Sequence, residues 1–179
     1  MLKRKNFLVH DSDFVVKKLY SKPSPTFLTY LKKINFSKSI KNKKINKNII
    51  REEIFSNKIK KNKLEKFIHN EVRKDRDRFI KKNKKTKVLF FDIPLLFEAN
   101  LSHTCDYIIL LYAPKDIRIK RAVLKKGIIK KMVLKILDNQ LGDNYKKKRS
   151  DFVINTSKSK THCFKMILEA IDIIINKNA

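Results

Sequence analysis

The sequence has 179 residues, 42% of them hydrophobic, which is enough for one compact domain with an apolar core. It contains no run of about 18 apolar residues that would span a membrane, and no apolar stretch of signal-peptide length follows its basic first residues. We therefore expect a cytoplasmic protein without a membrane partner.

The net charge of +28, taken alone, indicates a nucleic acid or another polyanion as a partner. The lysines, however, are dispersed through nearly every segment together with many Asn and Ile, which is typical of a composition bias rather than of one basic stripe. The sequence also has no zinc pattern and no aromatic RNA-stacking motif. A basic nucleic-acid-binding protein stays an alternative, but we expect no specific nucleic-acid partner.

The two cysteines, Cys105 and Cys163, stand far apart, and neither belongs to a CxxC pair or to a metal-ligand spacing. Cys105 precedes an apolar run and is most simply a buried thiol. We expect neither a disulfide nor a bound structural metal.

The N-terminal segment begins with a short apolar run, residues 7–9, which predicts a buried strand with carboxylates at its end, Asp11 and Asp13. Residues 14–20 show an apolar face at helical spacing and predict a helix. Residues 21–25 (SKPSP) then break that helix.

The next part of the chain is mostly helical in pattern. Residues 32–48 are rich in Lys and Asn and predict loop and short helix. Residues 51–80 predict one long helix, because apolar side chains recur at helical spacing at Ile54, Phe55, Leu64, Phe67, Ile68, Val72 and Phe79. Residues 81–87 are a polar connector.

The C-terminal half alternates predicted strands with predicted helices. Residues 88–93 (VLFFDI) are the clearest strand, of the continuous apolar kind that suits the centre of a parallel sheet, and Pro94 ends it. The other predicted elements are strands at 107–112 and 152–154 and helices from about 115, at 130–139 and at 161–175. This alternation predicts an α/β fold with a parallel sheet.

Ligands of such sheets bind beyond the carboxyl ends of the strands. Four residues fall at that edge in the predicted arrangement: Asp11, Asp13, Pro94 and Glu98. The edge is therefore the expected site.

Residues 92–98 (DIPLLFE) resemble the signature of the dephospho-coenzyme A kinases, a family of P-loop kinases. Other segments resemble that family in order and spacing: Asp11-Ser12-Asp13, residues 54–57 (IFSN), residues 64–69 (LEKFIH), Arg118 with Arg121, and Gln140, Lys146 and Asp151. The resemblance runs from about Phe7 to the C-terminus. It implies a three-layer P-loop kinase-like fold, in one domain, with a parallel sheet, a helical acceptor-substrate region at about 21–85 and a lid at about 118–150.

The resemblance also implies a reaction. The γ-phosphoryl group of ATP, with Mg²⁺, is transferred to the ribose 3′-hydroxyl of dephospho-coenzyme A, which is the last step of coenzyme A synthesis. Asp13 matches the family's second Asp and is our candidate for the carboxylate that accepts the hydroxyl proton; the alternative is that it caps the following helix. Asp11 would hold a magnesium-bound water or cap the strand.

Contacts to the acceptor are implied for His69, Arg73, Pro94 and Glu98. His69 and Arg73 lie four residues apart on one helix face, where Arg73 would meet a phosphate of the acceptor. Structural roles for His69 and Glu98 stay open.

Contacts to ATP or a place in the lid are implied for Arg118, Arg121, Lys125, Gln140 and Lys146. Arg121 is the best candidate for an arginine that closes over ATP and stabilises the charge of the transferring phosphoryl group. Lys125 stands where the family usually has a second arginine, and a lysine supplies charge without a planar fork.

The chain departs from the family at two further places. The proline that follows the family's histidine is Asn70 here, and the Asp-Asn pair near the family's adenine pocket reads Asn155-Thr156.

The P-loop motif GxxxxGK[ST] does not occur in this sequence, whose two glycines are Gly127 and Gly142. The family places that loop before the position of Asp11, and residues 1–6 resemble the end of the helix that follows it. The resemblance thus implies that the first strand and the P-loop are missing, through a misassigned start, which we favour, a gene fragment or a genuine loss. We expect no kinase activity from the chain as written.

A different P-loop kinase that acts on a nucleoside or nucleotide is the other alternative function. The DIPLLFE segment and the spacing from Gln140 to Asp151 argue against it.

Overall fold

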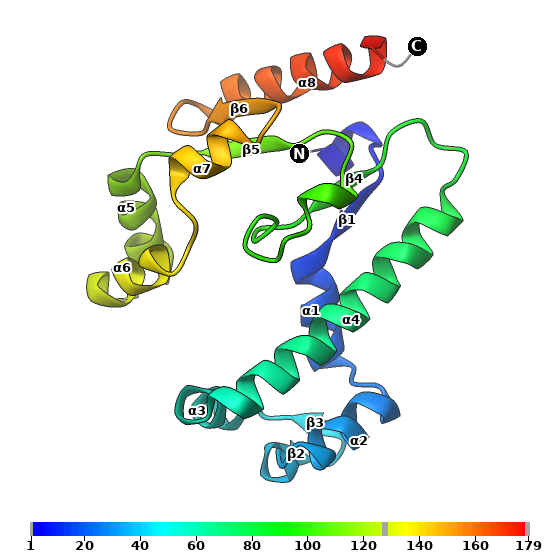
Figure 1. Cartoon of the computed structure of the whole chain (residues 1–179), viewed down its shortest axis with the longest axis vertical. Helices are drawn as coiled ribbons and strands as arrows, with labels where there is room; N and C mark the ends of the chain where they lie inside the picture. The colour runs from blue at the N-terminus through cyan, green and yellow to red at the C-terminus, as the bar shows by residue number, and fades with distance from the viewer. Residues whose placement is uncertain (1, 127–128, 178–179) are drawn as a thin grey trace. The chain divides into compact units, whose positions relative to one another are not determined.

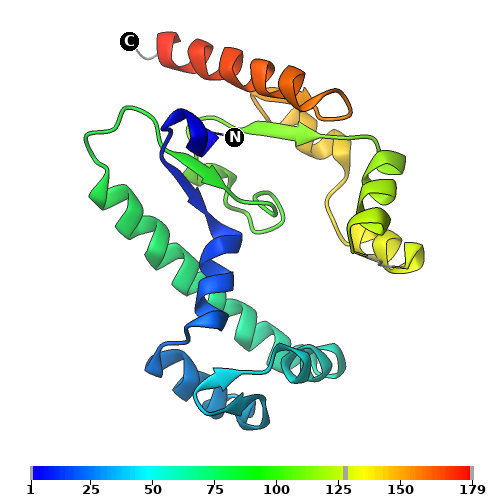
Figure 2. The ribbon, with the colours of Figure 1, turned by 180° about the vertical axis from the view of Figure 1, so that it is seen from behind.

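A computed structural model of the protein describes residues 2–126 and 129–177. The chain divides into two compact units, Met1–Ile93 and Pro94–Ala179, which Figures 1 and 2 show from opposite sides. No helix in the described part of the chain is long and apolar enough to cross a membrane.

The first unit is mainly helical. Its elements in chain order are η1 (Leu2–Lys5), β1 (Val9–Asp11), α1 (Ser12–Ser21), α2 (Pro25–Lys33), η2 (Ser37–Ser39), β2 (Ile40–Lys41), β3 (Lys44–Ile45), α3 (Lys47–Ser56), α4 (Lys58–Lys82) and β4 (Phe90–Asp92).

The second unit alternates strands and helices. Its elements are η3 (Ser102–Thr104), β5 (Ile109–Tyr112), α5 (Lys115–Lys126), α6 (Lys130–Asp138), α7 (Asp143–Lys148), β6 (Phe152–Asn155) and α8 (Lys160–Lys177).

The expected α/β architecture is confirmed, and the strands are distributed over three two-stranded sheets in the described residues. β1 pairs with β4 in parallel in the first unit, and β5 pairs with β6 in parallel in the second. The strand predicted at 88–93 is only the three residues of β4, and its one described partner is β1, so it is not at the centre of a wider sheet.

The core of the first unit is an apolar cluster between α2, α3 and α4. Phe27, Leu31 and Phe36 are fully buried, and Ile50 and Leu64 nearly so. Aromatic rings reinforce the cluster: Phe67 of α4 stacks on Phe27 at 5.2 Å and on Tyr30 at 4.3 Å between ring centroids. This packing holds α2 against α4, as Figure 1 shows.

The long helix predicted at 51–80 is in fact two helices that meet at Asn57. The backbone of Asn57 is extended, and its side chain accepts a hydrogen bond from the Lys60 amide, which begins α4 as an N-cap. Phe55, expected on the apolar face, is 88% exposed. The apolar spacing continues across Asn57, although this residue ends α3 and begins α4. Because of this break, Phe55 lies outside the core.

The helix α2 and the β2–β3 hairpin of the first unit were not predicted from the sequence. α2 begins with Ser24 as N-cap and Pro25 in its first turn, which are ordinary helix-start signals. The β2–β3 hairpin lies between α2 and α3, as Figure 2 shows. Its turn has positive φ at both Asn42 and Lys43, the conformation of a two-residue turn that matches the strand twist.

In the second unit α8 packs on β6, and Ile154, Cys163, Ala170 and Ile171 are buried there. At the start of the β5–β6 pair the Asp151 carboxylate accepts a hydrogen bond from the Ile108 amide at 2.7 Å. The expectation of a buried thiol was placed on Cys105, but Cys163 is the buried one and Cys105 is intermediate in exposure. The parallel strands β5 and β6 of the second unit have their carboxyl ends at Tyr112 and Asn155.

Candidate functional site

Carboxylates gather at the carboxyl ends of β1 and β4. The parallel register places Val9 opposite Phe90, His10 opposite Phe91 and Asp11 opposite Asp92. Side chains directly opposite in a sheet are near neighbours, so the two carboxylates are close. Asp13 follows in the first turn of α1. The sequence placed Asp11 and Asp13 at this edge, and the structure adds Asp92.

Asp11 and Asp13 have different local environments. The Asp11 carboxylate accepts a hydrogen bond from the Phe14 amide at 2.8 Å and is the N-cap of α1. Its other oxygen lies 3.9 Å from the Lys3 ammonium group. Asp13 is exposed within the helix. Helix capping, one of the two roles considered for Asp13, therefore belongs to Asp11, and the Asp13 carboxylate is not needed for that role.

The pKa of Asp92 is raised by partial burial, and the negative charges of Asp11 and Asp13 raise it further, while Lys3 lowers it. The contributions of Asp11 and Asp13 show that negative charge is concentrated at this edge, where a cation would neutralise it. No cluster of three or more His, Cys, Asp or Glu side chains in the described residues is arranged to hold a metal by itself.

His69 and Arg73 lie four residues apart on α4, and both are exposed. The Arg73 guanidinium group donates a hydrogen bond to the Asn70 side-chain oxygen at 3.0 Å. Asn70 stands where the family has proline, so this local contact is available only because of that departure. The guanidinium group keeps further N–H donors for an anion.

Glu98 lies in the turn after Pro94, which itself is exposed. The turn ends at Asn100, whose φ is 53°, and the Leu101 amide donates to the Leu96 carbonyl at 2.9 Å, as at the end of a helix. Glu98 Oε1 lies 2.6 Å from Lys146 Nζ and accepts a hydrogen bond from the Leu141 amide at 3.1 Å.

The Glu98–Lys146 ion pair is mostly buried, with 16% and 12% of the two side chains exposed. Burial raises the pKa of Glu98, but hydrogen bonds from Lys146, from its own backbone amide and from Leu141 outweigh burial and lower it. Phe97 also packs edge-on against Tyr145 of α7, with ring centroids 6.3 Å apart. The structure thus pairs one predicted acceptor residue with one predicted ATP residue and anchors the turn to α7.

The two arginines of the predicted lid also have protein partners. Arg118 of α5 lies 2.6 Å from the Asp143 carboxylate of α7. Arg121 donates to the Thr156 carbonyl at 2.6 Å and to the Thr156 hydroxyl at 3.3 Å, just beyond the end of β6. Sequence reasoning did not find Asp143 or the contact to Thr156, because neither has a local signal.

The remaining predicted lid residues are less informative. Gln140 lies in the turn between α6 and α7, where its backbone amide donates a hydrogen bond to the Leu137 carbonyl at 3.1 Å. The side chain of Lys125 lies outside what the structure describes, as does Gly127.

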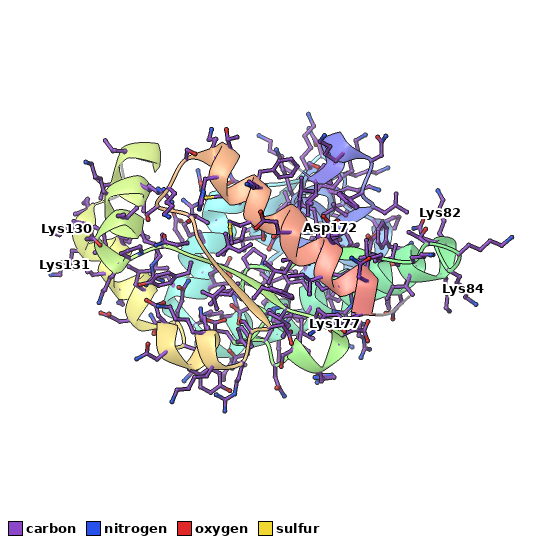
Figure 3. The ribbon with its side chains drawn as sticks, turned by 90° about the horizontal axis from the view of Figure 1, so that it is seen from above. Lys82, Lys84, Lys130, Lys131, Asp172 and Lys177 are labelled. Atoms are coloured by element: carbon purple, nitrogen blue, oxygen red, sulfur yellow. The ribbon has the colours of Figure 1, made fainter. Side chains whose placement is uncertain are left out.

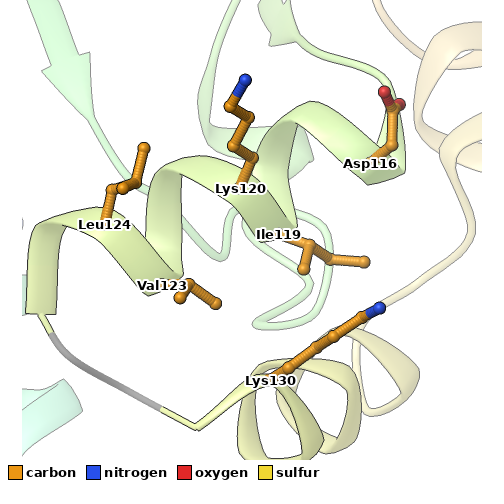
Figure 4. Close-up of a pocket in the computed structure, with 6 residues that line it drawn as sticks. All are labelled: Asp116, Ile119, Lys120, Val123, Leu124 and Lys130. Carbon is orange, nitrogen blue, oxygen red and sulfur yellow. The ribbon is translucent and has the colours of Figure 1, made fainter.

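A shallow hollow of about 440 Å³ lies between α5 and α6. Figure 4 shows Ile119 and Val123 on the side of α5 that faces α6, with Lys130 opposite them. The full lining is Asp116, Ile119, Lys120, Val123, Leu124 and Lys130. Because its surface is mostly apolar, the hollow does not suit a polyphosphate, and the carboxylate edge has the stronger claim to be the site.

The lysines labelled in Figure 3 belong to several elements: Lys82 to α4, Lys84 to the segment after it, Lys130 and Lys131 to α6, and Lys177 to α8.

Comparisons with known proteins agree with one another. The sequence model of the dephospho-CoA kinase family matches residues 1–161. A dephospho-CoA kinase of Listeria innocua is 33% identical over 136 residues, which cover 74% of this chain and 67% of the relative. A dephospho-CoA kinase of Fusobacterium nucleatum is 30% identical over 169 residues, which cover 93% of this chain and 85% of the relative.

Two solved structures are similar in fold. The dephospho-CoA kinase from Campylobacter jejuni gives a TM-score of 0.71 at 25% identity, with 99% of this chain and 90% of the other covered. The protein TT1252 from Thermus thermophilus gives a TM-score of 0.77 at 22% identity, with 95% and 85% covered.

Proposed function

Because this chain belongs to the dephospho-CoA kinase family, we propose that it serves the ATP-dependent phosphorylation of the ribose 3′-hydroxyl of dephospho-CoA, which gives coenzyme A. The observation that carries the proposal beyond the family match is the carboxylate edge formed by Asp11, Asp13 and Asp92 at the ends of two parallel strands.

Asp13 is the proposed general base. It is exposed and has no part in capping α1, since Asp11 makes that hydrogen bond. As the acceptor oxygen attacks the γ-phosphorus, its proton passes to the Asp13 carboxylate and the bond from phosphorus to the ADP oxygen breaks.

Acceptor binding is proposed for the exposed face of α4 that carries His69 and Arg73. Arg73 would pair with a phosphate of dephospho-CoA, because a guanidinium fork matches phosphate oxygens. Pro94 and Glu98 would contribute to acceptor binding by fixing the shape of the turn that contains them. The Glu98 carboxylate would not bind the acceptor directly, because it is already paired with Lys146.

ATP binding is proposed for the carboxyl-end side of the β5–β6 pair, where Arg121 lies against Thr156. Arg121 would exchange this neutral carbonyl for the more negative phosphoryl oxygens, which form stronger, charge-assisted hydrogen bonds. Arg118 and Lys146 are proposed to hold α5 and α7 in place through their ion pairs, while Lys125 and Gln140 complete the lid.

Magnesium is proposed to arrive with ATP. Mg²⁺ is commonly held by one or two carboxylates together with nucleotide phosphates and waters. Asp11 and Asp92 fit that requirement: burial raises the pKa of Asp92, the negative charges of Asp11 and Asp13 raise it further, and a cation would relieve this repulsion. The ion would neutralise charge on the phosphates, and Asp11 would reach it through a bound water.

The sequence contains no GxxxxGK[ST] motif to cradle the ATP phosphates with backbone amides. We therefore propose that the 179-residue chain alone transfers no phosphate at a measurable rate. Joining a segment with a strand, a GxxxxGK[ST] loop and a helix before Met1 should supply the backbone amides that the reaction needs.

The test compares the chain alone with the extended chain, in ATP and dephospho-CoA, and measures coenzyme A directly. The expected result is no product from the chain alone, product from the extended chain, and a loss of at least about 100-fold in kcat for Asp13→Asn in the extended chain. Asp172→Asn, at an exposed position of α8, is the matched control and should be fully active.

An extended chain that folds but stays inactive would contradict the proposed activity. An Asp13→Asn variant as active as the control would contradict the role of Asp13 alone.

A further inference from the structure

His10 is a buried histidine to which the proposed reaction gives no role. It lies in the middle of β1, and its side chain is only 3% exposed. Its Nε2 is 3.2 Å from the Asp75 carboxylate of α4. Because a carboxylate can only accept, Nε2 carries the proton of this hydrogen bond.

The surroundings of the imidazole are otherwise apolar. The rings of Phe79 of α4 and Phe91 of β4 lie 5.6 Å and 6.2 Å from it, centroid to centroid. Within the described residues, the buried Nδ1 has no hydrogen-bond partner. An apolar side chain would fill this slot without leaving a buried nitrogen unpaired, so packing alone does not explain a histidine here.

The bond to Asp75 connects the carboxylate edge to the long helix. Successive side chains of a strand point to opposite faces, so His10 faces α4 when Asp11 faces away from it. Asp75 belongs to α4, which also carries His69 and Arg73. Its second oxygen lies 3.4 Å from Arg78, which helps to hold the carboxylate in place.

Such a tie matters because the sheet that contains β1 is small. In the part of the chain that the structure describes, the strand has three residues and pairs with one three-residue strand. Isolated two-stranded pairings are only marginally stable, so a side-chain anchor contributes much to the position of β1.

We propose that His10 is a positioning residue, which fixes β1 to α4 through Asp75 and so sets the distances between Asp11, Asp13 and Asp92. The catalytic meaning of this inference rests on the proposed function, but the positioning itself does not.

The test measures backbone amide hydrogen exchange in the full chain at neutral pH, read at the Phe90 amide, which donates to the Leu8 carbonyl at 2.9 Å across the β1–β4 pair. His10→Phe fills the slot between Phe79 and Phe91 but cannot bond to Asp75, whereas His10→Gln retains an N–H donor at a similar reach. The expected result is that the Phe90 amide exchanges with solvent about tenfold faster in His10→Phe than in the wild type, and at the wild-type rate in His10→Gln.

Two further variants keep the test decisive if His10→Phe folds poorly. Asp75→Leu should speed the exchange of the Phe90 amide about tenfold, like His10→Phe. Asp75→Asn, whose amide oxygen still accepts, should leave this exchange as slow as in the wild type. His103→Gln, at an exposed histidine of the second unit, is the control.

Equal exchange rates of the Phe90 amide in the wild type, His10→Phe and Asp75→Leu would overturn the inference. So would exchange that is faster to the same degree at the Ile34 amide, which donates to the Tyr30 carbonyl at 3.1 Å, because that result would show a general loss of stability. Failure of the proposed function shows instead as an inactive extended chain and leaves these exchange rates unchanged, so the two failures are distinguishable.

Discussion

The carboxylate of Glu98 and the ammonium group of Lys146 lie 2.6 Å apart in a mostly buried ion pair that joins the turn after Pro94 to α7. The pair is not equivalent to a surface salt bridge, because neither charge regains full hydration when its partner is removed. Loss of this ion pair should therefore be measurable as a decrease in the free energy of unfolding.

Lys146→Met should lower the free energy of unfolding by about 2–3 kcal/mol, since it leaves the Glu98 carboxylate buried without its charged partner. Urea denaturation at neutral pH measures the change. Lys61→Met is the matched control, because Lys61 and Glu65 form a pair at 3.8 Å with about half of each side chain exposed, and it should cost less than about 0.5 kcal/mol. Equal losses in the two variants would show that the Glu98 pair is no stronger than a surface pair.

The stabilising effect of the Glu98 pair should disappear in acid. The pKa of Glu98 is lower in the folded protein than in the unfolded chain, so the contribution is complete above the ordinary glutamate pKa and is lost as the pH falls through the lower folded value. Stability measured from pH 7 down to about 3 should fall more steeply in the wild type than in Glu98→Gln, whose side chain does not titrate. Parallel curves would contradict the lowered pKa.

Asp92→Asn should raise the stability of the protein at pH 7 by up to about 1 kcal/mol, a modest amount because Asp92 is exposed enough for solvent to screen it. The sign follows from the raised pKa of Asp92: the folded state holds the proton more tightly, so the ionised form destabilises it at neutral pH. The stability gained by Asp92→Asn should disappear as the pH falls below the pKa of aspartate in the unfolded chain. A thermal shift series over pH, with Asp77→Asn as control, measures it.

Asp11 and Asp13 should differ in their effects on stability. Asp11→Ala should be about 1 kcal/mol less stable than Asp11→Asn, because only the asparagine keeps the N-cap hydrogen bond to the Phe14 amide. This comparison removes the charge in both variants and isolates the cap. Asp13→Ala and Asp13→Asn should differ from each other by less than about 0.5 kcal/mol. A larger difference at position 13 would contradict Asp11 as the N-cap of α1.

Local signals in the sequence were enough for most elements of the second unit. The strands at β5 and β6 and the helices at α5, α6 and α8 follow from apolar runs and helical periodicity, and the structure confirms them within a few residues. The first unit was harder, because the helical spacing continues through Asn57 although the chain breaks there to cap a new helix. Periodicity reports which side chains are apolar, and a single capping residue decides where one helix ends.

Residue types and local spacing were sufficient to recognise the family, the α/β alternation and the carboxylates at a strand end. The long-range pairings could be seen only in the folded chain. Glu98 meets Lys146, Arg121 meets Thr156 and His10 meets Asp75. Each pair joins residues far apart in the chain, and such contacts arise from the packing of whole elements, for which a single sequence carries no local signal.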